Sequence, residues 1–143
     1  MTKLSDTLVS AICQRGVITI SATERLSTVE DIMTLGHVRH MPVVLAGRLV
    51  GVVSERDLLR ASLSNLSHHR SEERRAFLHV VEIESVMSSP PIVVPPDASV
   101  AEAARIMAEK KIGCLPVVKE HHLEGMITET DVLRFVATTE SAR

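Results

Sequence analysis

The sequence predicts an α/β protein in which one small unit, strand–helix–strand–strand–helix, occurs twice. The first observation is an internal repeat, because residues 18–60 align with residues 92–134 without a gap. The second is that β-prone runs and apolar residues at helical spacing follow one another in the same order in both copies. The third is composition. Hydrophobic residues make up 45% of the 143 residues, and two phenylalanines are the only aromatic residues, so we expect an aliphatic core.

The identities between the copies lie at positions that define the pattern. They pair Ile32-Met33 with Ile106-Met107, Pro42–Val44 with Pro116–Val118, Gly51 with Gly125, Glu55 with Glu129, Asp57 with Asp131, and Leu59-Arg60 with Leu133-Arg134. Two copies of one unit usually pack about a pseudo-two-fold axis. Any site at that axis is then expected to occur as a related pair.

The first copy begins with a β-prone run at residues 17–20. Apolar residues at helical spacing predict a helix over residues 26–33. Residues 40–45 are predicted as a strand with a proline near its start, where a strand tolerates one. Residues 49–53 return as the hairpin partner, and a second helix covers residues 54–63.

The second copy repeats this order. Ser99 and Glu102 have the spacing of a capping box at the start of its first helix. The predicted elements are strands at 92–94, 115–118 and 123–127, with helices over 100–107 and from residue 128 onward.

The two copies fill nearly the whole chain. The expected boundaries are residues 5–63 for the first repeat, 64–78 for a helical linker and 79–137 for the second repeat. Residues 5–16 are expected to lead into the first copy, and a helix with a solvated charged face at 70–75 is expected to lead into the second. No separate catalytic domain fits in the remainder.

Charge and composition exclude several classes of protein. The formal net charge of −2 gives no electrostatic reason to expect nucleic acid or an anionic membrane as a partner. The chain lacks an apolar run of the roughly 20 residues that span a membrane. It also shows no signal-peptide pattern, so we expect a cytoplasmic protein. Cys13 and Cys114 are too few and too far apart for a disulfide framework or a zinc site.

The segment that could carry chemistry is residues 51–57, with its echo at 125–131. Each reads Gly-x-x-(Ser/Thr)-Glu-x-Asp before an apolar helix, and Ser/Thr-x-x-Asp alone is typical of a helix capping box. The same geometry would place a hydroxyl and a carboxylate beside the free N–H groups of a helix start, where an anion binds well. An aspartate there could also accept hydrogen bonds from ribose hydroxyls. The glycine would let another backbone or a ligand approach closely.

In this order, and present twice, these residues resemble the CBS (cystathionine β-synthase) domain. The doubled Met…Pro-Val-Val…Gly-x-x-(Ser/Thr)-Glu-x-Asp-(Leu/Val)-Leu-Arg is similar to a tandem CBS pair, or Bateman module, of the short stand-alone bacterial type. The resemblance implies two β-α-β-β-α repeats that bind an adenosine-containing ligand (AMP, ADP, ATP or S-adenosylmethionine) in the cleft between them. It also implies a homodimer and a regulated partner protein. The adenine nucleotide would be a regulatory ligand, and no cofactor is required.

The resemblance also implies the residues of two nucleotide sites. Asp57 and Asp131 would anchor the ribose, with Ser54 and Thr128 beside them. The opposite repeat would complete each site: Ile92, Ile112, Gly113 and Cys114 for Asp57, and Ile18, Val38, Arg39 and His40 for Asp131.

Cationic residues before the shared proline are the candidates for contacting ligand phosphates. These are Arg39 and His40, with Arg56 third. A solvated basic loop is the alternative interpretation. The second copy has Gly113 and Cys114 in place of the first two, so we expect two sites that differ in affinity or in the charge of the ligand they prefer.

Three functions remain open from the sequence. The first is the nucleotide-sensing module, and the second is a ligand-free structural or interaction module whose capping boxes are only architectural. The third is a small enzyme acting on the nucleotide, but no Ser or Cys nucleophile has a recognisable base, so we expect no catalytic residues. Two histidine pairs, His37 with His40 and His121 with His122, lack the further ligands of a metal site, so we expect no metal.

Overall fold

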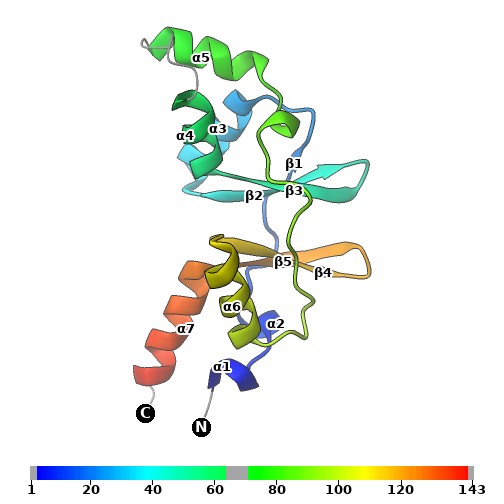
Figure 1. Ribbon diagram of the computed structural model, residues 1–143, viewed down its shortest axis with the longest axis vertical. Coiled ribbons are helices and arrows are strands. Elements are labelled where there is room, and N and C mark those ends of the chain that lie inside the picture. The colour runs from blue at the N-terminus through cyan, green and yellow to red at the C-terminus, as the bar shows by residue number, and fades with distance from the viewer. Residues whose placement is uncertain (1–2, 64–70, 142–143) are drawn as a thin grey trace. The chain divides into compact units, whose positions relative to one another are not determined.

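The computed structural model describes residues 3–63 and 71–141 and divides into two compact units (Figure 1). The first unit comprises Ile18–Pro91 and contains the first repeat. The second unit joins Met1–Val17 to Ile92–Arg143 and contains the second repeat. The α/β class predicted from the sequence is confirmed, with one repeat in each unit.

The first unit has a three-stranded sheet in the order β1-β2-β3, with β1 parallel to β2 and β2 antiparallel to β3. Two helices of the repeat flank the hairpin, and a further helix and a short 3₁₀ turn follow them. The elements are β1 (Ile20–Ser21), α3 (Leu26–Gly36), β2 (His40–Leu45), β3 (Arg48–Ser54), α4 (Glu55–Leu63), α5 (Ser71–Val80) and the 3₁₀ turn at Ile83–Ser85.

The second unit has a two-stranded antiparallel sheet, β4-β5, and two short helices from the start of the chain. Its elements are α1 (Lys3–Asp6), α2 (Val9–Ile12), α6 (Val100–Lys110), β4 (Cys114–Lys119), β5 (His122–Thr128) and α7 (Glu129–Ser141). The strand expected at 92–94 is reduced to one parallel bridge between Val94 and Val117. Prolines stand on both sides of it, and proline has no N–H to donate to a ladder, so the pairing cannot extend.

The two hairpins share the same register. His40 lies opposite Ser54 in the first, and Cys114 lies opposite Thr128 in the second. Each register shifts between the two valines of the Pro-Val-Val run. The repeat seen in the sequence is therefore reproduced down to its strand pairing.

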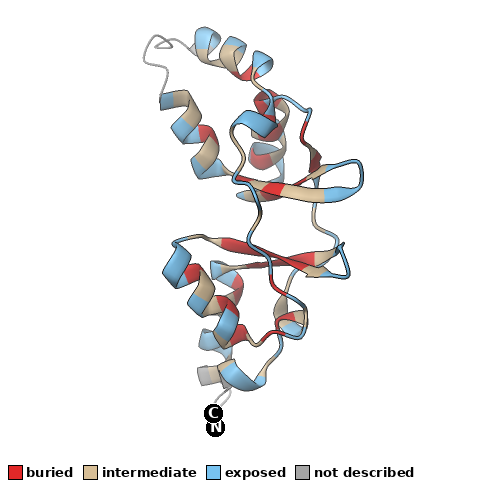
Figure 2. Cartoon of the chain, turned by 45° about the vertical axis from the view of Figure 1, so that its right-hand side comes forward, coloured by how far each residue is buried: buried red, intermediate tan, exposed pale blue. Residues whose placement is uncertain are grey.

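Each unit has its own aliphatic core, as the composition predicts (Figure 2). In the first unit Leu26, Met41 and Val53 are fully buried, and in the second Leu115 and Ile127 are. Buried residues lie along the strands and along one side of the helices, while exposed residues lie on the outer side of the helices.

The segments that precede the repeats pack differently from the sequence-based expectation. Residues 5–16 were expected to lead into the first copy, but Val9 is fully buried in the core of the second unit. The helix α5 and the segment after it likewise pack in the first unit, where Leu78 of α5 and Ile83 are fully buried. The reason is that the outer edges of β3 and β5 need hydrogen-bond partners, and these segments supply them.

The pairing at both sheet edges follows the same geometry. Gln14 and Met126 exchange two main-chain hydrogen bonds, of 2.8 and 2.9 Å. Ser88 and Val52 exchange two of 2.9 and 3.1 Å. Gln14 and Ser88 thus occupy equivalent positions beside the two repeats.

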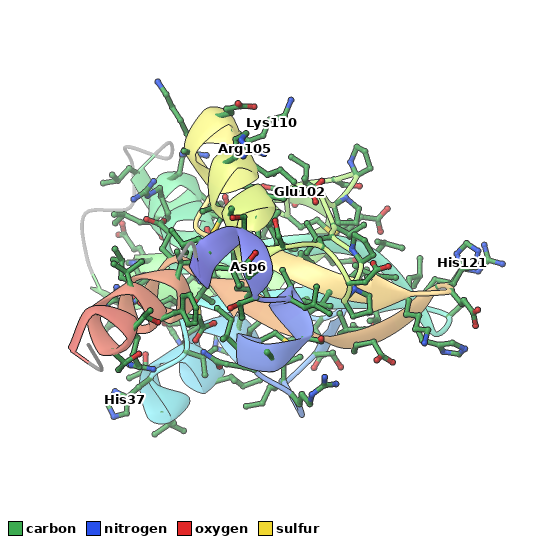
Figure 3. All side chains as sticks on the ribbon, turned by 90° about the horizontal axis from the view of Figure 1, so that it is seen from below. Asp6, His37, Glu102, Arg105, Lys110 and His121 are labelled. Carbon is green, nitrogen blue, oxygen red and sulfur yellow. The ribbon has the colours of Figure 1, made fainter. Side chains whose placement is uncertain are left out.

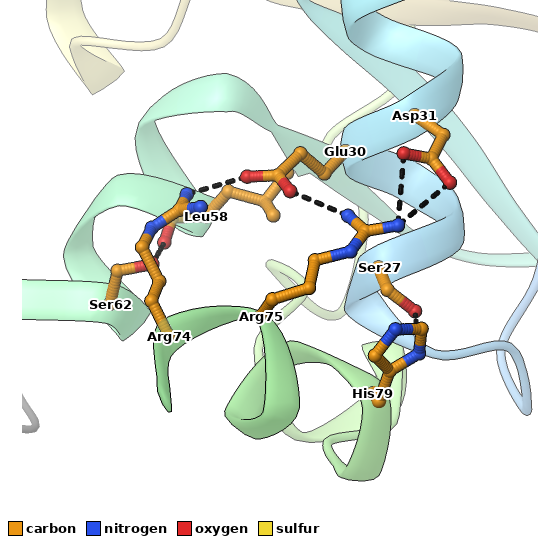
Figure 4. A network of polar contacts seen from close by, with 8 residues as sticks. All are labelled: Ser27, Glu30, Asp31, Leu58, Ser62, Arg74, Arg75 and His79. Atoms are coloured by element: carbon orange, nitrogen blue, oxygen red, sulfur yellow. Dashed lines mark hydrogen bonds and ion pairs between the residues drawn. The ribbon is translucent and has the colours of Figure 1, made fainter. Parts of the chain in front are cut away.

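Polar contacts fasten α5 to α3 within the first unit (Figure 4). Glu30 pairs with Arg74 at 2.6 Å and with Arg75 at 2.7 Å, and Arg75 also reaches Asp31 at 3.0 Å. These carboxylates, Asp31 foremost and Glu30 next, raise the pKa of the Arg75 guanidinium. The two arginines of the expected solvated face thus pair with carboxylates of α3, while their side chains stay 39% and 36% exposed. Residues 64–70 of the expected linker lie outside the described residues.

Among the described helices, none has both the length and the apolar character needed to cross a membrane.

Candidate functional site

Each capping box, called a box below, runs from the Ser or Thr to the Asp of its motif. The first box, residues 54–57, joins the end of β3 to the start of α4. The main-chain N–H of Ser54 donates to Asp57 Oδ2 at 2.8 Å, and the N–H of Asp57 donates to Ser54 Oγ at 3.1 Å. These reciprocal bonds satisfy donors that a helix start leaves open. Oδ1 of Asp57 has one charged neighbour among the described residues, the exposed Arg60 at 3.9 Å.

The second box has the same geometry and one bond more. The N–H of Thr128 donates to Asp131 Oδ2 at 2.8 Å, and the N–H of Asp131 donates to Thr128 Oγ1 at 3.3 Å. The Thr128 hydroxyl donates to Asp131 Oδ2 at 3.0 Å. The capping interpretation of both motifs is thus confirmed, and each leaves a carboxylate beside a helix N-terminus.

Gln14 belongs to the second box, and the sequence analysis missed it. Its amide nitrogen donates to Asp131 Oδ1 at 3.1 Å and lies 3.4 Å from Oδ2. Asp131 is 8% exposed, and the side chain of Asp57 is 12% exposed, so both carboxylates are largely shielded from water. No local sequence pattern links residues 14 and 131. The available signal was the internal repeat, which aligns Gln14 with Ser88 and so gives the two residues equivalent places beside their repeats.

The loop before each hairpin closes against the box of its own repeat. The carbonyl of Arg39 accepts a hydrogen bond of 2.8 Å from the N–H of Glu55, and the carbonyl of Gly113 accepts one of 3.0 Å from Glu129. The structure therefore brings the candidate cationic loop of the first repeat against the start of α4. The equivalent loop of the second repeat has no side chain at Gly113, and its cationic residue is Lys111, two positions earlier.

The remaining candidates fall into three environments. Exposed side chains are Ile18, Arg39, Arg56 and Ile92. The half-buried residues are Val38, His40, Ile112 and Gly113, and Cys114 is buried. Val38 packs against the core of the first unit and Ile112 against that of the second. Completion of each site by the opposite repeat stays a prediction.

At the glycine of each motif, atoms of a neighbouring segment lie close to the position that a Cβ would occupy. A Cβ on Gly125 would collide with the main-chain carbonyl oxygen of Gln14. A Cβ on Gly51 would lie 2.7 Å from Met87 Sδ and 2.8 Å from the carbonyl oxygen of Ser88. Of the two explanations for these glycines, the close approach of a neighbouring segment is the one observed.

Cys13 lies half-buried beside the second box. Burial raises the pKa of its thiol, Arg15 opposes that rise, and the carboxylate of Asp131 adds to it. A thiol in this state carries less thiolate at neutral pH than a free cysteine does, so it is a weak nucleophile.

The described residues contain no group of three or more side chains able to hold a metal ion. His121 projects from the turn between β4 and β5, and Glu102, Arg105 and Lys110 lie along the exposed side of α6 (Figure 3). His37 ends α3 in the left-handed conformation, with φ of 53°.

The family follows from comparison with known domains. The CBS domain family model matches residues 9–64 and 83–138. These two segments make up most of the chain, which therefore belongs to the CBS domain family and carries two copies of the domain.

Relatives and solved structures agree with this assignment. Protein MJ1225 of Methanocaldococcus jannaschii, which is uncharacterized, is 34% identical over 126 residues. A Vibrio cholerae structure described as a candidate acetoin utilization protein, AcuB, has a TM-score of 0.81 and 32% identity, covering 94% of this chain and 95% of that one. The CBS domain pair of MJ0100, solved with 5′-methylthioadenosine and S-adenosyl-L-methionine, has a TM-score of 0.75 and 25% identity, covering 91% and 99%.

The chain spans less than half the length of the first curated relatives it matches. The match takes up 86% of this chain but 45% of MJ1225, and 94% of this chain but 33% of MJ1404 from the same organism. In an inosine-5′-monophosphate dehydrogenase of Korarchaeum cryptofilum the matched region is 22% of the protein. In these proteins the matched region is therefore one part of a longer chain.

Proposed function

We propose that this protein is a regulatory module that binds an adenosine-containing ligand, such as AMP, ADP, ATP or S-adenosylmethionine, and signals to a partner by a conformational change. The observation that carries the proposal is the doubled box, a carboxylate and a hydroxyl at a helix start in both repeats. A carboxylate can accept from vicinal ribose hydroxyls, and helix N–H groups favour an anion. The ligands named for the MJ0100 pair are both adenosine derivatives, which supports the choice of ligand class.

In this proposal each residue type has its own role. Asp57 and Asp131 anchor the ribose, and Ser54 and Thr128 lie beside it. The side chains that would contact phosphates are Arg39, His40 and Arg56. The proposed remaining contacts, with the adenine and the ribose edge, come from Ile18, Val38, Ile92, Ile112, Gly113 and Cys114.

Isothermal titration calorimetry with AMP, ATP, S-adenosylmethionine and NAD tests the proposal. The informative variants are Asp57→Asn and Asp131→Asn, because asparagine keeps one oxygen for the capping bond while removing the charge and one acceptor. We expect each substitution to weaken binding at its own box by tenfold or more, on the order of a lost hydrogen bond to a charged group.

A matched control is available in α6. Ser99 Oγ accepts the N–H of Glu102 at 3.0 Å, which is the same capping device away from both boxes. Ser99→Ala should cost stability, about 1 kcal/mol, and leave binding unchanged. Equal loss of binding in this variant and in the two aspartate variants would mean that the aspartates act only through folding.

One observation favours a second function. Both boxes satisfy their own helix starts without a ligand, so a ligand-free interaction module needs no further group at either site. The absence of heat with all four ligands, from a folded protein, would select this function. Turnover of ATP or AMP by the purified protein would instead select an enzyme.

A homodimer belongs to the same proposal. Each unit exposes large apolar side chains on the second helix of its repeat. These are Leu59 and Leu63 on α4, and Leu133 and Val136 on α7. Exposed apolar groups of this kind typically mark an interface between proteins. We expect sedimentation to report a dimer that Leu59→Glu or Leu133→Glu weakens, while Leu35→Glu on α3 leaves it intact.

A further inference from the structure

The two boxes differ in the hydrogen bonds that their aspartate carboxylates already accept. The Asp131 carboxylate accepts the Gln14 amide at 3.1 Å in addition to the two bonds that it accepts from Thr128. Ser88 holds the position in the first unit that Gln14 holds in the second, as the matching main-chain pairs show. Within the described chain, the Ser88 side chain makes no hydrogen bond to Asp57.

Most hydrogen-bond acceptor positions of the Asp131 carboxylate are already occupied. A carboxylate has about four acceptor positions. Oδ2 accepts from the N–H and the hydroxyl of Thr128, and Oδ1 accepts from Gln14. A ribose needs two acceptors for its vicinal hydroxyls, so it cannot gain both while the amide stays in place. The Asp57 carboxylate accepts fewer bonds: among the described residues, the one charged group near its Oδ1 is Arg60, at 3.9 Å.

We infer that Gln14 is a built-in competitor for the ribose position at Asp131, so that the two boxes select ligands with unequal strength. This inference rests on the proposed function and adds a residue that determines affinity. The Gln14 amide takes the place of a hydroxyl donor, and a ribose must displace it before both hydroxyls are bound. The box at Asp57 binds without this step.

Displacement requires only the side chain to move. The main chain of Gln14 is held by two hydrogen bonds to Met126, and its carbonyl oxygen is pressed against Gly125. Gln14 itself is exposed, so its amide can rotate into water and be hydrated there. The competition is therefore local, and removal of the amide should leave the fold intact.

The test isolates the second box in the full-length chain. In the Asp57→Asn background, calorimetry compares Gln14 with Gln14→Ala for AMP, S-adenosylmethionine and 2′,3′-dideoxy-AMP. We expect Gln14→Ala to tighten AMP binding about two- to tenfold, the range that one hydrogen bond represents. The same substitution should raise the affinity for the dideoxy analogue much less, because that ligand has no ribose hydroxyls to compete with Gln14 for Asp131. A purely structural role for Gln14 would not distinguish these two ligands.

Controls separate this inference from the proposed function. Ser88→Ala should leave binding at both boxes unchanged, and Gln14→Ala in the Asp131→Asn background should have no effect. Weaker or unchanged AMP binding in Gln14→Ala would contradict the inference that Gln14 competes with the ribose. The proposal that the protein binds a nucleotide would be unaffected. The absence of binding of AMP and S-adenosylmethionine by the wild type and by Gln14→Ala would overturn both.

Discussion

The main-chain carbonyl oxygen of Gln14 lies against Gly125, in the space that a Cβ would fill. This contact lets the N-terminal segment pair with β5 through two hydrogen bonds to Met126. The same pairing carries the Gln14 amide to Asp131. One glycine therefore supports both the packing of a distant segment and the composition of the second box.

Gly125→Ala should lower the free energy of unfolding by about 3 kcal/mol, the upper part of the range for overpacking, because the obstructing atom belongs to the backbone. Gly51→Ala should cost about 1 to 2 kcal/mol, because a Cβ there would lie 2.7 Å from Met87 Sδ, which can move, and 2.8 Å from the Ser88 carbonyl oxygen, a milder overlap than the one at Gly125. Urea denaturation followed by circular dichroism measures both, since the chain has no Trp or Tyr. Gly36→Ala, where the nearest atom is a Val38 methyl at 3.2 Å, is the control. Equal, small losses in all three variants would contradict the close approach.

Leu78 fixes α5 to the core of the first unit. It is fully buried, so Leu78→Ala should cost about 2 to 5 kcal/mol from lost burial and the cavity left behind. Leu35→Ala makes the same change at a side chain that is 82% exposed and should stay within about 0.5 kcal/mol. Comparable urea midpoints for the two variants would show that α5 does not pack where the structure places it.

Glu30 holds two arginines of α5, whereas Asp31 holds one. Glu30→Ala should therefore speed amide hydrogen exchange in α5 more than Asp31→Ala does. Both effects should shrink in about 1 M salt, where the screening length is only a few ångström. Glu73→Ala, an exposed substitution on α5 itself, serves as the control. Salt-independent exchange in the wild type and both variants would mean that the ion pairs do not hold the helix.

The thiol of Cys13 should alkylate more slowly in the folded protein than in urea, because burial raises its pKa and reduces the thiolate fraction. Arg15→Gln should slow the reaction further, since the positive charge of Arg15 lowers that pKa. Asp131→Asn should speed it, since the negative charge of Asp131 raises the same pKa. Iodoacetamide labelling at pH 7.5 to 8.5 in a Cys114→Ala background measures all three rates. The opposite order of the two variants would contradict the assigned electrostatics.

The repeat and the local elements follow from the sequence because their causes are local. The helix at 100–107, the Ser99 cap and both Pro-Val-Val hairpins depend on residues within a few positions of one another. The same holds for both boxes, whose bonding atoms are three residues apart. The repeat and the local spacing therefore predicted the fold class and the two boxes, and the resemblance to CBS domains implied the role of their aspartates.

What the tertiary structure decided is which distant segments meet. Local spacing carries no information on whether residues 5–16 complete the first or the second core, and the burial of Val9 decides it for the second. The strand expected at 92–94 shrank to a bridge at Val94, because pairing depends on a partner strand as well as on β-propensity. Gln14 and Asp131 are 117 positions apart, and they meet only because the edge of β5 accepted the N-terminal segment. Sequence alone thus determined the two equivalent carboxylates, and tertiary packing made them unequal.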